Sequence, residues 1–154
     1  MFIGHFPAGY LAMRAARARG HVMMWGLIGA VAPDLDMLAF HFWYDGAVHH
    51  HNFVTHRPAV WAGITVVALL GLWLGRQPWA FAMLAFGAAG LLHMCLDSIV
   101  GQIAWGWPFS EAAAPLVVVS ATHDWWVMSF LTHWTFGVEL IVCATALLVW
   151  WRRS

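Results

Sequence analysis

Apolar residues dominate the chain in long runs, which short polar stretches separate. Runs of this length are typical of membrane-embedded helices. The predicted fold is an all-α, polytopic membrane helical bundle of about five helices, with a short N-terminal helix. One domain, residues 1–154, is expected for a chain of this size. The predicted helices cover residues 6–18, 22–42, 58–75, 79–100 and 125–151.

The second of these helices contains a break in an unusual place. Pro33 removes a backbone N–H group and disfavours a helical Ala32. Asp34 and Asp36 follow it within a mostly apolar run of roughly 20 residues. A carboxylate at membrane depth costs a few kcal/mol unless it has a partner, and broken backbone there must be buried in protein or line a wet cavity. We therefore expect a polar site at this break.

Composition strengthens the membrane interpretation. Hydrophobic residues make up 62% of the chain and charged residues 9%, whereas a soluble domain has about a quarter charged residues. The net charge is zero with neutral histidine, so no basic surface argues for a nucleic-acid partner. The two cysteines, Cys95 and Cys143, fall in apolar runs and indicate packing rather than a disulfide.

The arginines predict an orientation in the membrane. If the turn at residues 19–21 is placed inside, only Arg57 falls outside. Cytoplasmic loops carry an excess of arginine and lysine, so we expect a multi-pass protein with a cytoplasmic C-terminus. The arginines that fall inside are Arg14, Arg17, Arg19, Arg76, Arg152 and Arg153.

Histidine and aspartate side chains from separate helices are expected to meet in the outer half of the bundle. In a hairpin of the first two helices, His5 lies opposite a residue about 15 positions past the turn, level with Asp34 and Asp36. His93 and Asp97 share one helical face, roughly 10 and 5 Å below the outer end of their helix. The outer loop adds imidazoles at His49, His50, His51 and His56.

Structural alternatives exist for these residues. His93 and Asp97 can form a simple hydrogen bond, and Asp34 and Asp36 can cap the broken helix or pair with Arg57. Histidine and aspartate without thiolate nevertheless fit a catalytic metal site better than a closed structural one, and imidazole suits zinc and other first-row ions. The last helix carries two more polar residues whose roles stay open, His133 and Glu139.

Short motifs that contain these residues occur in a fixed order along the chain. They are Gly4-His5, Pro33-Asp34-Leu35-Asp36, His51-x4-His56, His93-x3-Asp97 and Trp107-Pro108-Phe109. The ordered set, which covers residues 4–109, resembles the bacterial inner-membrane, metal-dependent hydrolase family typified by YdjM and YbcI. This resemblance implies a bacterial inner-membrane location and a hydrolase. Met37 stands where the family pattern has histidine, and His49 or His50 can compensate for it.

The predicted function is therefore membrane-embedded, metal-dependent hydrolysis. About one to three divalent ions, Zn²⁺ or Mn²⁺, would activate a water molecule, and Asp34 or Asp97 would take its proton. A site just under the outer surface suits a membrane lipid, so a lipid-linked ester or phosphoester is the expected substrate. The predicted metal ligands are drawn from His5, Asp34, Asp36, His51, His56, His93 and Asp97.

Two other classes of function compete with this one. A metal-binding membrane protein or ion transporter can use the same residues, but a transporter needs polar residues that continue inward, and only Glu139, Thr65 and Thr145 do so. A structural or partner-binding protein leaves many buried titratable groups unexplained. The sequence does not determine the oligomeric state.

Overall fold

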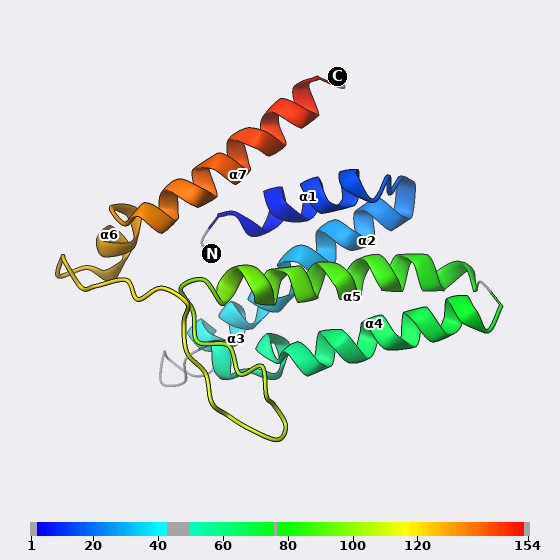
Figure 1. Ribbon diagram of the computed structural model, residues 1–154, viewed down its shortest axis with the longest axis horizontal. Helices are drawn as coiled ribbons and strands as arrows, with labels where there is room; N and C mark the ends of the chain where they lie inside the picture. The colour runs from blue at the N-terminus through cyan, green and yellow to red at the C-terminus, as the bar shows by residue number, and fades with distance from the viewer. Residues whose placement is uncertain (1–2, 43–49, 76, 153–154) are drawn as a thin grey trace.

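The computed structural model describes residues 3–42, 50–75 and 77–152, and these residues form helices and connecting segments without a strand. The prediction of an all-helical fold is therefore confirmed for this part of the chain. The elements, in order, are α1 (His5–Ala15), α2 (Gly20–Val31), η1 (Ala32–Leu35), α3 (Asp36–Phe42), η2 (His50–Asn52), η3 (Val54–His56), α4 (Pro58–Trp73), α5 (Pro78–Asp97), α6 (Trp126–Leu131) and α7 (Trp134–Trp151), where η denotes a 3₁₀ helix (Figure 1).

The predicted break at Pro33 is confirmed. Helix α2 ends at Val31, and Pro33 lies in the first turn of η1. Backbone N–H groups in a first turn make no hydrogen bond within the helix, so proline, which lacks this group, is tolerated there. Asp36 then begins α3. The break thus places both aspartates at helix starts.

The prediction of one continuous helix over 125–151 is wrong. The chain forms α6, leaves the helical conformation at His133 (φ −82°, ψ 145°), and begins α7 at Trp134. His133 is the N-cap of α7, because its side chain accepts a hydrogen bond from the backbone N–H of Thr135. No proline or glycine marks this break, and a histidine N-cap is a weak sequence signal.

Helix α5 is the centre of the packing. It packs against α2 and α4, while α1 packs against α2 and α7 (Figure 1). Glycines let these helices approach closely: a Cβ at Gly29 of α2 would clash with the backbone of Phe86, and one at Gly90 of α5 with the ring of Trp61. Small residues at helix contacts are typical of membrane proteins.

Two helices, α5 and α7, are long and apolar enough to cross a membrane by length and composition, and α4 is a shorter apolar helix. The break at Pro33 divides residues 20–42 into α2, η1 and α3, each too short to cross a membrane alone. The described residues therefore offer fewer full-length spans than the sequence predicts.

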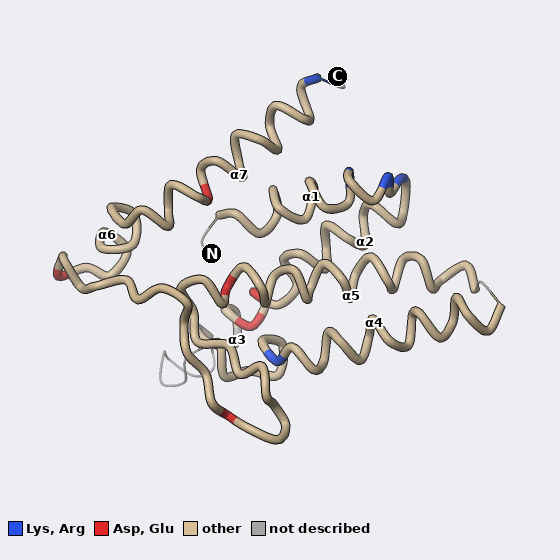
Figure 2. The backbone as a smooth tube through the Cα atoms, in the orientation of Figure 1, with Lys and Arg blue, Asp and Glu red and all other residues tan. Residues whose placement is uncertain are grey.

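The described arginines other than Arg57 lie at one end of the molecule (Figure 2). Arg14 lies in the last turn of α1, Arg19 is the N-cap of α2, and Arg152 is the C-cap of α7. Figure 2 shows these helix ends on the same side, away from the aspartate positions near the end of α5. This distribution agrees with the arginine pattern on which the predicted orientation depends.

Candidate metal centre

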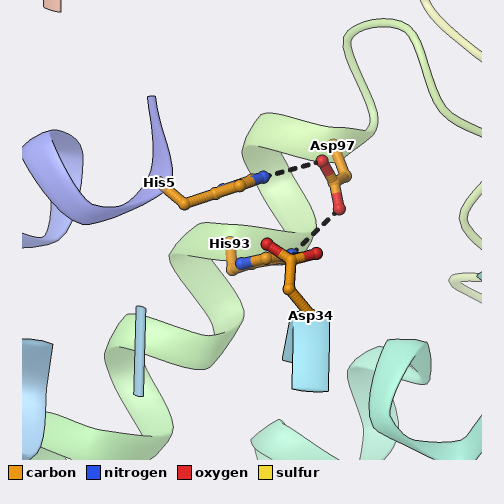
Figure 3. A group of neighbouring side chains, drawn as sticks. All are labelled: His5, Asp34, His93 and Asp97. Carbon is orange, nitrogen blue, oxygen red and sulfur yellow. Dashed lines mark hydrogen bonds and ion pairs between the residues drawn. The ribbon is translucent and has the colours of Figure 1, made fainter. Parts of the chain in front are cut away.

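The last turns of α5 carry a buried histidine–aspartate pair. His93 Nδ1 lies 2.8 Å from the carbonyl oxygen of Ala30 in α2. A carbonyl only accepts, so Nδ1 carries the proton and donates it. In the neutral ring Nε2 then has the lone pair, which is the form that binds a metal. This Nε2 lies 3.0 Å from Asp97 Oδ2 and 3.5 Å from Asp34 Oδ1 (Figure 3).

His5 reaches the same aspartate from the start of α1. Its Nε2 lies 3.0 Å from Asp97 Oδ1, and its ring is stacked on that of His93 with centroids 3.6 Å apart. The two oxygens of Asp97 therefore face two histidines from different helices (Figure 3).

Asp34 completes this first group and is its most accessible member. The side chain of Asp34 is 39% exposed, whereas that of His93 is fully buried. One ligand atom from each of His5, Asp34, His93 and Asp97 can be chosen so that all lie within 4.8 Å of one another. Ligands at about 2.0–2.2 Å from a tetrahedral zinc ion lie about 3.3–3.6 Å apart. The contacts of His93 at 3.0 and 3.5 Å are close to this spacing, and the more distant pairs would have to approach one another on binding.

A second group shares Asp97 with the first. It consists of His51, His56 and Asp97, whose ligand atoms also lie within 4.8 Å of one another. His56 Nε2 is 3.5 Å and His51 Nε2 3.8 Å from Asp97 Oδ2. Gly101 makes room for this arrangement, because a Cβ there would clash with the His51 ring.

Asp36, a predicted ligand, lies behind His56 instead of in either group. Its Oδ2 is 2.5 Å from His56 Nδ1 and accepts a hydrogen bond from Thr55 Oγ1. Burial lowers the pKa of His56, but hydrogen bonds to Asp36 and Asp97 raise it more, so the pKa lies above its usual value. A carboxylate behind a histidine is a common support of metal sites.

Arg57 does not neutralise the aspartates, which removes one structural alternative. Its guanidinium donates to Glu111 Oε2 at 2.7 Å and to the carbonyl oxygen of Asn52 at 3.2 Å. The basic groups that the described chain brings to Asp34 and Asp97 are imidazoles.

The remaining candidate histidines are His133, His49 and His50. His133 caps α7, His49 lies outside the described residues, and of His50 only the backbone is described. Sequence reasoning missed the supporting groups, the Ala30 carbonyl and the Thr55 hydroxyl. Neither has a sequence signal of its own, although Thr55 directly precedes a predicted ligand.

The helical fold, the two apolar helices of spanning length and the buried polar cluster together indicate a helical membrane protein. The chain belongs to the YdjM inner membrane protein family, whose model matches residues 1–154. No curated protein and no solved structure matches it significantly. The family description gives a location and names no reaction.

Proposed function

We propose that this inner membrane protein is a metal-dependent hydrolase with two adjacent cation sites that share Asp97. The observation that supports this proposal is the orientation of two histidines. His93 and His56 each have Nδ1 bonded to a fixed oxygen, from Ala30 and Asp36, so each presents Nε2 to Asp97. A simple structural hydrogen bond needs no such convergence.

The donor atoms suit a catalytic ion. They are imidazole nitrogens and carboxylate oxygens without thiolate, from residues that are buried except for Asp34 and the half-buried His51. Such a set fits Zn²⁺ or Mn²⁺. A cation would also stabilise Asp34 and Asp97, the two carboxylates of these groups.

When bound, the ion would supply Lewis-acid chemistry: it lowers the pKa of a water molecule and polarises an ester or phosphoryl oxygen. Asp97 is held between His5 and His93, which suits a ligand. Asp34 has the exposed side chain and faces the same point. Asp34 is therefore our choice for the base that takes the proton from water.

A lipid-linked ester or phosphoester is the substrate class that fits this position best. The cluster lies at the end of α5, a helix of 20 residues, or about 30 Å. A head group at the membrane surface can reach the exposed edge of the cluster at Asp34, while the acyl chains remain in the bilayer.

The alternative, an ion transporter, is less well supported by what lies next to the cluster. Trp61, Met94 and Ile103 form an apolar core there, with Phe86 packed against it. Thr65, one of the few polar residues further along, donates its hydroxyl to the carbonyl oxygen of Trp61 in its own helix. A polar cluster bordered by an apolar core suits hydrolysis better than transport.

For the membrane arrangement, we propose a multi-pass topology with a cytoplasmic C-terminus. The helix ends that carry Arg14, Arg19 and Arg152 lie on one side of the molecule, as the positive-inside rule requires. Segments α2, η1 and α3 together, residues 20–42, have the length of one span even though each piece is short.

The deciding experiment uses protein purified in detergent, stripped with a chelator and reloaded with Zn²⁺ or Mn²⁺. Release of a head group from fluorescent phospholipid and polyprenyl-phosphate substrates should require reloading, and Asp34→Asn should abolish release even at metal concentrations that restore full occupancy. If reloaded protein releases no product but carries Zn²⁺ or Mn²⁺ across liposome membranes, the hypothesis of an ion transporter replaces this proposal.

A further inference from the structure

Glu139 is a carboxylate that the proposed reaction does not use. It lies in α7 and is 1% exposed. Its Oε2 accepts hydrogen bonds from the backbone N–H groups of Ile3 at 2.7 Å and Gly4 at 3.0 Å. These residues immediately precede His5, which begins α1. One side chain of the last helix thus binds the segment that carries a proposed ligand.

This contact is a polar link between α7 and the start of α1. Helix α7 packs chiefly on α1 (Figure 1), and only 17% of its residues are buried, compared with 44% of an 18-residue stretch of α5. Apolar contacts alone would let α7 and the start of α1 slide along each other. Two charge-assisted hydrogen bonds fix the register between them.

The side chain of His5 depends on that register. Its Nε2 must lie within reach of Asp97 Oδ1, now 3.0 Å away, and its ring must stack on His93. The first backbone N–H groups of a helix lack partners within the helix. Glu139 supplies an acceptor just before α1 and so orders the segment from which the His5 side chain projects.

We propose that Glu139 is a positioning residue, which holds the start of α1 so that His5 completes the metal centre. The inference rests on the proposed function only in taking His5 as a metal ligand. The anchoring itself is a property of the metal-free chain. It also assigns α7 a role, because this helix contributes no side chain to either ligand group.

The test combines two measurements on protein in detergent. The first is amide hydrogen exchange of the N-terminal peptide with chelator present. Glu139→Ala should speed exchange at residues 3–5, and Glu139→Gln, which retains an acceptor oxygen, should largely prevent this change. Thr145→Val is the matched control on α7, since the Thr145 hydroxyl bonds only to the Ile141 carbonyl of its own helix; it should leave exchange unchanged.

The second measurement is Zn²⁺ affinity by competition with a chromophoric chelator. Glu139→Ala should weaken binding about tenfold, the low end for supporting residues. In a His5→Ala background the same change should have no further effect, because Glu139 acts through His5. Unchanged exchange in Glu139→Ala, or an equal loss of affinity with and without His5, would overturn the inference. If His93→Ala retains full metal binding, the metal centre fails instead, and the exchange result alone decides the anchoring.

Discussion

The imidazole rings of His5 and His93 lie face to face, with centroids 3.6 Å apart and planes inclined by 10°. Two imidazolium charges at this distance would repel by about 5 kcal/mol at an effective dielectric constant of 20. The stack therefore favours at least one neutral ring, and a neutral ring is the form that binds metal. It also ties the start of α1 to the last turns of α5, so binding at the cluster and stability of the bundle are linked.

This linkage predicts that metal and stability are lost together. His93→Ala and Asp97→Asn should each lower bound Zn²⁺ or Mn²⁺, measured by mass spectrometry of the metal, and lower Tm. At free metal 100 times Kd, binding stabilises the native state by about 2.7 kcal/mol, which corresponds to about 5–10 °C in a chain of this size. A chelator should cause the same drop in the parent protein and little in the variants.

His21→Ala is the control for these variants, because His21 is exposed near the start of α2 and lies in neither ligand group. It should change neither metal content nor Tm. Full metal occupancy in both site variants would reduce the pair His93 and Asp97 to a structural hydrogen bond.

A second prediction concerns the support behind His56. Asp36→Asn removes the charge from the carboxylate that lies 2.5 Å from His56 Nδ1. Loss of such a supporting residue typically weakens metal binding 10–100-fold, and we expect a change of about that size by chelator competition. Glu111→Gln, the same kind of change at an exposed acid paired with Arg57, should leave the affinity unchanged. An equal response of the two variants would exclude a specific role for Asp36.

The sequence predicts those parts of the site that depend on local geometry. Helical periodicity alone puts His93 and Asp97 on one face, and the covalent constraint of Pro33 alone predicts the break before Asp34. The position of His5 needed one further step, the register of a short hairpin. The structure brings His5 within the same ligand group as Asp34, where that register predicts it.

The remaining features depend on contacts between distant segments. Whether Asp36 faces an ion or supports His56 is decided by the fold of the outer loop, which spacing does not specify. The helix break at His133 is accompanied by a hydrogen bond between its side chain and the Thr135 backbone. No proline at this position indicates the break in the sequence. The role of Glu139 cannot be predicted from its neighbours in sequence, because the groups it bonds, the backbone N–H groups of Ile3 and Gly4, lie at the other end of the chain.

A third prediction tests the close packing that delivers the Ala30 carbonyl to His93. Gly29→Ala forces a methyl group against the backbone of Phe86, and overpacking of this kind typically costs about 1–3 kcal/mol. The shift should also weaken metal binding, because Ala30 is the next residue. Gly63→Ala in α4 is the matched control, since nothing lies within 4 Å of a Cβ there. It should be neutral or slightly stabilising. A similar Tm for both variants would show that the α2–α5 contact tolerates separation.

The last prediction tests the topology, on which the location of the cluster near the outer surface depends. In a variant lacking Cys95 and Cys143, a single cysteine is placed at one of two positions. One is Phe109, which is 97% exposed in the connection after α5. The other is Arg152, the exposed C-cap of α7. If the arginine-rich ends are cytoplasmic, an impermeant thiol reagent should label Phe109→Cys in intact cells and should label Arg152→Cys only after the membrane is permeabilised.

The reverse pattern would place the cluster near the cytoplasmic surface, and the substrate would then have to be a lipid of the inner leaflet. Labelling of both sites in intact cells would mean that α7 does not cross the membrane, leaving α5 as the one described helix of full spanning length.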